Sequence, residues 1–225
     1  MGMGVSSPRI IGRSEELGAL SNAIARATAG DPGIVVVAGA AGVGKSRLIA
    51  EFSARANALG ARVLVGDCLE LVGGGLPFGP LAAILRDIAR TTGQERLDQL
   101  FGPDRGEFAR LVPELGLAPD PGSAPGRDAL AGSDVDSSRA QARLFEHLLA
   151  LLGRLGNEAP TAVVLEDVHW IDPATRDLVS FLARNLKVQR VLLVLTSLPT
   201  STTSPAVSCP ITCGTLIRLL AHSSH

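Results

Sequence analysis

Cysteine is scarce in this chain. Its three cysteines, at positions 68, 209 and 213, do not make up the even set of a disulfide framework, and the last two have no second pair with which to form a zinc site. No run of 18 apolar residues occurs, and the first eight residues lack the basic and then apolar order of a secretory signal. We therefore expect a cytoplasmic protein that does not contact a membrane.

An excess of charge of either sign is also missing. The chain has 21 Lys and Arg against 22 Asp and Glu, which gives a net charge of −1. A chain that binds nucleic acid directly would need a basic face, so we expect no direct nucleic-acid binding. With 225 residues, of which 46% are hydrophobic, the chain can bury the core of one α/β domain.

What the chain does contain is a complete G-x-x-x-x-G-K-[ST] phosphate-binding loop at residues 39–46. An apolar run at 34–38 precedes it and an amphipathic helix pattern follows it, so a chance Gly/Ala-rich turn is the less favoured alternative. Glycines let backbone N–H groups approach phosphates, Lys45 would neutralise the outer phosphates, and the Ser46 hydroxyl would bind Mg²⁺. The residues expected to contact ATP here are Gly39, Ala40, Ala41, Gly42, Val43, Gly44, Lys45, Ser46 and Arg47.

A strand that ends in acidic residues follows at 162–167, where four apolar residues precede Glu166 and Asp167. Ligands of parallel α/β sheets bind at the carboxyl edge, so this pair and the phosphate loop are expected to meet there. We assign Glu166 to Mg²⁺ and Asp167 to the catalytic base that orients the attacking water, with Lys45 as the second catalytic residue. The two acidic roles could be exchanged, and a pair of merely solvated carboxylates is the alternative.

Local patterns predict the remaining elements. A helix over 14–29 has Ser14 as its N-cap, and Asp172 caps a helix that begins at Pro173, with His169 and Trp170 packing the turn before it. The other expected elements are strands at 62–66 and 191–196, helices at 78–91, 94–100, 107–111 and 139–155, and a flexible loop at 119–138.

Taken together, these segments resemble the N-terminal AAA-like ATPase module of the large ATP-binding LuxR-type transcriptional regulators, which are signal-transduction phosphate-loop NTPases. The likeness runs from about residue 10 to 196 and rests on the stretches 11–17, 39–46, 66–68, 73–80 and 165–173. It implies a three-layer α/β phosphate-loop NTPase fold with a parallel sheet in the order 5-1-4-3-2. It also implies that Ile11, Gly12 and Arg13 lie near the adenine, where a surface helix start is the alternative.

The family pattern breaks after Thr196. A Tyr-Arg pair usually follows this threonine, but here Ser197 and Leu198 follow, and Arg218 is the only charged residue from 197 to 225. We therefore expect an incomplete ATP-binding domain at 1–196 and an aberrant, disordered tail at 197–225 that arose by truncation or frameshift. The fold would then lack its lid and its fifth core strand, and strand 34–38 would be an exposed edge open to self-association. Alternatively, residues 215–220 cover that edge.

These observations predict an ATP-binding module of a signalling or transcription-regulator NTPase that binds ATP with Mg²⁺ and hydrolyses it weakly or not at all. Weak hydrolysis is expected because the sequence lacks the arginine that usually follows Thr196, a lid and an arginine finger. An arginine finger alone contributes about 10³ to 10⁵ in rate. A non-enzymatic ATP-gated scaffold and a non-functional truncated product are the alternatives. A kinase is weaker, because no acceptor-binding set of residues is found.

Overall fold

The computed structural model describes residues 12–69, 77–116, 134–199 and 214–219 of the chain. Within them, five parallel strands form one sheet in the order β2-β3-β4-β1-β5, which is the order that the resemblance implied. The strands are β1 (Gly33–Gly39), β2 (Arg62–Asp67), β3 (Thr161–Glu166), β4 (Val191–Ser197) and β5 (Gly214–Leu219).

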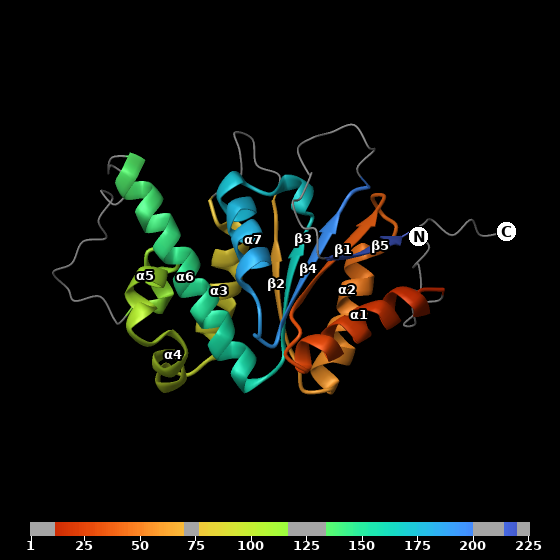
Figure 1. Cartoon of the computed structure of the whole chain (residues 1–225), viewed down its shortest axis with the longest axis horizontal. Coiled ribbons are helices and arrows are strands. Elements are labelled where there is room, and N and C mark those ends of the chain that lie inside the picture. Colours follow the sequence, from red (N-terminus) through yellow and green to blue (C-terminus); the bar gives the residue numbers. More distant parts are fainter. Residues whose placement is uncertain (1–11, 70–76, 117–133, 200–213, 220–225) are drawn as a thin grey trace, which may run out of the picture.

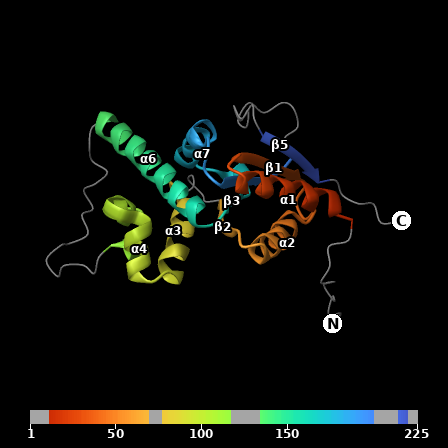
Figure 2. The same cartoon turned by 60° about the horizontal axis from the view of Figure 1, so that its bottom comes forward.

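Helices cover both faces of the sheet, so the expected three-layer architecture is confirmed (Figures 1 and 2). One face carries α1 (Ser14–Thr28) and α2 (Lys45–Ala58). The other carries α3 (Gly79–Thr91), α6 (Asp134–Glu158) and α7 (Pro173–Asn185), with α4 (Gln94–Phe101) and α5 (Arg105–Ala109) outside them. Short 3₁₀ turns lie at η1 (Gly102–Asp104), η2 (Pro113–Leu115) and η3 (Val168–Trp170).

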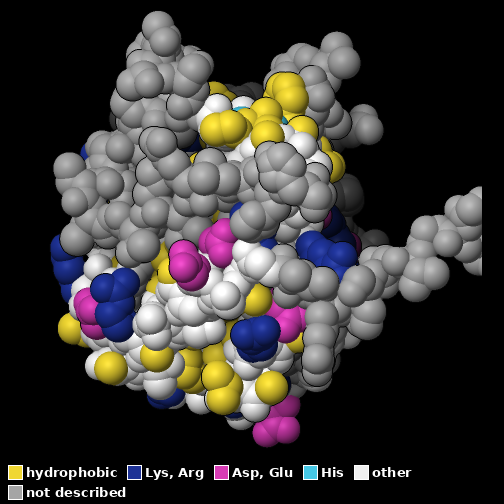
Figure 3. All heavy atoms as spheres, turned by 90° about the vertical axis from the view of Figure 1, so that its right-hand side faces the viewer, with side chains coloured by type: hydrophobic (Ala, Val, Ile, Leu, Met, Phe, Trp, Pro, Cys, Tyr) yellow, Lys and Arg dark blue, Asp and Glu magenta, His cyan; other side chains and the backbone are white. Residues whose placement is uncertain are grey.

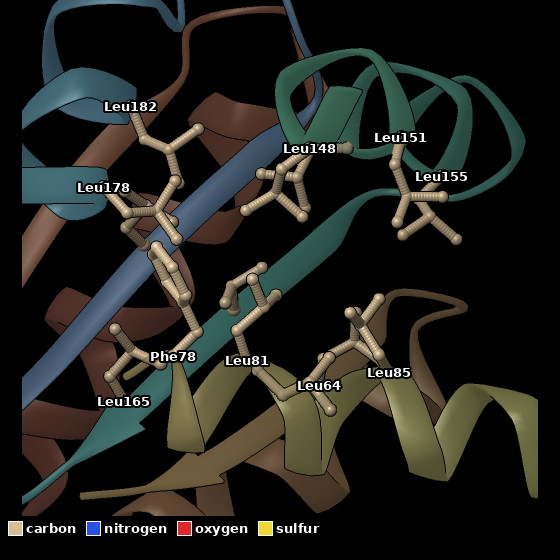
Figure 4. Packing of buried hydrophobic residues seen from close by; sticks show 14 of the residues in the cluster. Leu64, Phe78, Leu81, Leu85, Leu148, Leu151, Leu155, Leu165, Leu178 and Leu182 are labelled. Atoms are coloured by element: carbon tan, nitrogen blue, oxygen red, sulfur yellow. The ribbon is translucent and has the colours of Figure 1, made fainter. Parts of the chain in front are cut away.

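The central strands are apolar because both of their faces are covered. Alternate residues of β3 point into different cores: Ala162 and Val164 pack with α1 and α2, whereas Val163 and Leu165 pack with the helices of the opposite layer. Figure 4 shows this second core, in which leucines of α3, α6 and α7 meet above the sheet. Leu148, Leu151 and Leu155 of α6 therefore pack into the protein core.

The expected loss of the fifth strand is wrong. Strand β5 pairs in parallel with β1 over six positions, from Ile34 opposite Gly214 to Gly39 opposite Leu219, so β1 lies inside the sheet. The alternative, that the segment around 215–220 covers the edge, is the one observed. The physical reason is that β1 presents a row of unpaired N–H and C=O groups, which a strand-forming stretch can pair whatever its charge content.

Two further differences concern helix ends. Helix α6 begins at Asp134, so the last residues of the expected loop 119–138 are helical, while most of that loop and most of the expected tail lie outside the described residues. The N-cap of α1 is Arg13 and not Ser14, and the Arg13 side chain makes no capping hydrogen bond.

No helix in the described ranges is both long and apolar enough to cross a bilayer. Figure 3 shows the side of the molecule that carries α1 and β5, where side chains of both charge signs are interspersed.

Candidate nucleotide-binding site

The phosphate loop connects the end of β1 to the start of α2 at Lys45. Its backbone is left-handed at Gly42 (φ 73°) and Gly44 (φ 97°), a conformation that glycine adopts without steric cost. A Cβ added at either glycine would meet no atom within 4 Å, so these positions need glycine for their backbone angles and not for lack of room. The outer side of the loop is therefore open, as a cradle for phosphate requires.

Lys45 is buried, and its ammonium lies against the first residues of the loop. Its Nζ donates hydrogen bonds to the carbonyl oxygens of Gly39 (3.0 Å) and Ala40 (3.3 Å), the first two residues of the loop. The positive charge is thus held at the N-terminus of α2, where the helix dipole also favours an anion. Ala40, Ala41 and Arg47 are exposed around it.

The phosphate loop and the acidic strand end meet through Ser46 and Glu166. The Ser46 hydroxyl donates a 2.6 Å hydrogen bond to Glu166 Oε2, although the two residues are 120 positions apart in the chain. A hydroxyl and a carboxylate are oxygen ligands of the kind that Mg²⁺ prefers, so the pair fits the expected ion. Among the described residues, no group of three or more His, Cys, Asp or Glu could hold a metal alone. The remaining ligands would have to be phosphate oxygens and water, as is usual for Mg²⁺.

Asp167 occupies a left-handed conformation (φ 52°) directly after β3. Its backbone N–H donates a 2.9 Å hydrogen bond to Thr196 Oγ1 at the end of the neighbouring strand β4. Its carboxylate side chain is 46% exposed. The sequence reasoning did not include Thr196 in the site, although a hydroxyl at the end of an otherwise apolar strand was a usable signal.

His169 and Trp170 lie in η3, between Asp167 and α7. The Nδ1 atom of His169 is 3.9 Å from Asp167 Oδ1, too far for a hydrogen bond, and it is buried without a hydrogen-bond partner. The His169 and Trp170 rings are 5.1 Å apart and tilted by 46°. Asp172 then caps α7 as expected, since its carboxylate accepts a 2.9 Å hydrogen bond from the Thr175 N–H.

Cys68 lies beside this turn and was not expected at the site. Its N–H donates to the carbonyl oxygen of Glu166 (3.0 Å), and burial, followed by the negative charges of Asp172, Asp167 and Asp67, raises the pKa of its thiol to about 12. A thiol with so high a pKa is a poor nucleophile, so Cys68 is a packing residue. Of the motif at 73–80, residues 73–76 lie outside the described residues.

The segment expected near the adenine is described only in part. Ile11 lies outside the described residues, and Gly12 is exposed with a φ of 79°. The Arg13 side chain is buried, and its Nη2 donates a 3.2 Å hydrogen bond to the carbonyl oxygen of Val43 in the phosphate loop. The start of α1 and the phosphate loop are therefore in direct contact.

A family model for an AAA ATPase domain matches residues 9–195. The chain belongs to this family. The AAA ATPase domain is a nucleotide-binding phosphate-loop NTPase module, so the match agrees with the loop and strand end described above.

An uncharacterized protein of Rhizobium meliloti (strain 1021) is 32% identical over 200 residues, which are 84% of this chain and 18% of that protein. The chain therefore spans less than a fifth of this relative. The crystal structure of Cdc6p from Pyrobaculum aerophilum is similar in fold, with a TM-score of 0.52, 17% identity, and coverage of 97% of this chain and 48% of that one. A signal transduction ATPase with a tetratricopeptide repeat sensor from Pyrococcus horikoshii has a TM-score of 0.46 at 17% identity over 95% of this chain and 24% of its own.

Proposed function

We propose that this AAA ATPase domain is the Mg²⁺-dependent ATP-binding module of a signalling protein or transcriptional regulator of the LuxR type. The observation that carries the proposal is the hydrogen bond between Ser46 and Glu166, because it brings together the phosphate loop and the acidic strand end that would form the two halves of a magnesium-nucleotide site. The regulator context rests on the motifs at 11–17 and 165–173. It is consistent with the small share, 18%, that this domain covers of its Rhizobium relative.

Each side chain has a distinct role in this proposal. Lys45 and the loop amides would hold the phosphates, and Ser46 and Glu166, which are hydrogen-bonded to each other, would hold one Mg²⁺. Magnesium would neutralise charge on the phosphate oxygens. Asp167 directly follows Glu166 in the chain and would orient a water molecule for attack, while its backbone N–H donates a hydrogen bond to the Thr196 hydroxyl. Ile11, Gly12 and Arg13 complete the nucleotide-binding set.

Hydrolysis is proposed to be slow. Strand β4 ends in Thr196 and Ser197, and Leu198 and Pro199 follow, so no arginine stands next to the threonine. Without a cation at this point, charge that develops on the transferred phosphoryl group loses a stabilising partner. The same observation favours a second candidate function, in which ATP binding alone changes the contacts of a larger protein.

The experiment is a measurement of ATP affinity for the purified chain, with and without Mg²⁺. Lys45→Ala should weaken binding at least about 100-fold, because a charge-assisted contact to phosphate is lost. Lys187 is the only other lysine in the chain and is exposed, so Lys187→Ala is a matched control that should bind as the wild type does. Equal binding by the Lys45 and Lys187 variants would contradict the proposed site.

A second pair of variants separates the two candidates. If hydrolysis is required, Asp167→Asn should abolish the function of the larger protein that contains this domain, while leaving the affinity for ATP intact. If ATP acts only as a switch, Lys45→Ala should abolish the output and Asp167→Asn should preserve it. ATP turnover by each variant is measured beside ATP affinity.

A further inference from the structure

Arg13 carries a buried positive charge between α1 and the phosphate loop. Only 8% of the residue is exposed, and its guanidinium lies between two partners. Nη1 forms a 2.9 Å ion pair with Glu16 Oε1, one turn along α1, and Nη2 donates a 3.2 Å hydrogen bond to the carbonyl oxygen of Val43. A buried guanidinium is costly unless its donors are satisfied, so the geometry between α1 and the phosphate loop is well defined.

The acceptor lies at a sensitive position of the loop. Val43 stands between the two left-handed glycines, Gly42 and Gly44, and its own N–H donates to the carbonyl oxygen of Ala40 (3.3 Å). The peptide between Val43 and Gly44 is planar and trans, so its C=O and N–H point in opposite directions. Because the C=O is directed at Arg13, the Gly44 N–H is turned away from Arg13. Arg13 thereby fixes the orientation of one loop amide that could bind phosphate.

We propose that Arg13 is a positioning residue that acts through the phosphate loop and so supports binding of the triphosphate whatever base it carries. This role differs from the contact with adenine that the family resemblance implies for the same residue. The inference rests on the proposed function, because it requires that the loop binds phosphate. Glu16 belongs to the same arrangement, since it orients the guanidinium from within α1.

The test compares two ligands that share the triphosphate, Mg-ATP and inorganic Mg-tripolyphosphate, of which the second lacks the adenosine. The chain has one Trp and no Tyr, so the fluorescence of Trp170 reports on the site, and calorimetry provides an independent affinity. Arg13→Met keeps much of the side-chain length and removes the donors. It should weaken the binding of both ligands by the same factor, about tenfold, as expected for one hydrogen bond from a charged group.

Three further variants sharpen the test. Arg13→Lys should restore part of the affinity for both ligands, because an ammonium cannot serve both partners as a planar guanidinium does. Glu16→Gln should weaken both ligands equally and by less than Arg13→Met does, and it tests the inference if Arg13→Met fails to fold. Arg90 pairs with Asp87 at the surface of α3 in a similar i,i+3 contact, so Arg90→Met should bind both ligands as the wild type does.

Three results would overturn the inference. A loss confined to ATP, with tripolyphosphate unchanged, would assign Arg13 to the adenosine part of the nucleotide and overturn the inference. A lower melting temperature with both affinities unchanged would show a purely structural role and overturn it equally. Failure of the wild-type chain to bind either ligand would overturn the proposed function, and the inference with it.

Discussion

The phosphate loop and the turn between β3 and α7, residues 167–172, lie at the same edge of the sheet but are built by different means. The loop reaches left-handed backbone angles with glycines, Gly42 and Gly44, and so presents bare amides. The turn reaches the same region with Asp167, for whose carboxylate we propose a role in the site, and a hydrogen bond from its backbone N–H to Thr196 secures it. A site that binds through its backbone can use glycine, whereas a site that works through a carboxylate must tolerate strain.

The largest effect in this comparison is expected from Thr196→Val. The substitution leaves the partly buried N–H of Asp167 without its acceptor, which should lower the free energy of unfolding by about 2 kcal/mol. Urea denaturation measures the change. Thr196→Ser keeps the hydroxyl and should recover most of the loss, and equal stability of the Val and Ser variants would show that this hydrogen bond does not secure the turn.

Gly44→Ala tests whether the phosphate loop requires glycine for its left-handed backbone. No atom lies within 4 Å of the added Cβ, so the cost is the left-handed backbone alone, about 1 kcal/mol. Gly18 is a suitable control, because it also has open space around an added Cβ but lies in the interior of α1 without a positive φ. Gly18→Ala should therefore not destabilise the protein. A Gly44→Ala variant with wild-type stability would mean that the loop does not require glycine there.

Asp167 can be tested against both small residues. Asp167→Gly should be more stable than Asp167→Ala by up to about 1 kcal/mol, because only glycine adopts φ 52° without strain. Both variants lack the carboxylate, so the difference isolates the backbone from the chemistry. Equal stabilities by denaturation would remove the argument that the turn is strained.

The smallest structural effect concerns Cys68, which packs beside the turn. With Cys209→Ser and Cys213→Ser in place, Cys68 is the one remaining thiol. Its pKa is raised from 9.0 to about 12, so its thiolate fraction at pH 8 is about 1,000-fold below that of an ordinary thiol. Alkylation should be correspondingly slow and keep accelerating above pH 10, and a rate that levels off near pH 9 would contradict the buried environment.

Much of this site could be predicted from the sequence, because the relevant signals are local. Parallel strands put their carboxyl ends at one edge, so the meeting of Ser46 and Glu166 followed from two short motifs. Strand β5 was expected only as the alternative, because the abrupt loss of charge after Thr196 outweighed the strand-forming residues at 215–219. The contact of Arg13 with Val43 could not be predicted, since it depends on how α1 packs against the loop. The N-cap of α1 was predicted to be Ser14 and not Arg13, because serine is a common N-cap residue.

The central claim is that Ser46 and Glu166 hold one Mg²⁺ for one nucleotide. The most direct test is a double-mutant cycle on the gain in ATP affinity that Mg²⁺ provides, with Ser46→Ala, Glu166→Gln and the double variant. If both residues serve the same ion, either substitution removes most of the gain and the double variant loses little more. Losses that simply add, or a full Mg²⁺ gain in the double variant, would contradict the account.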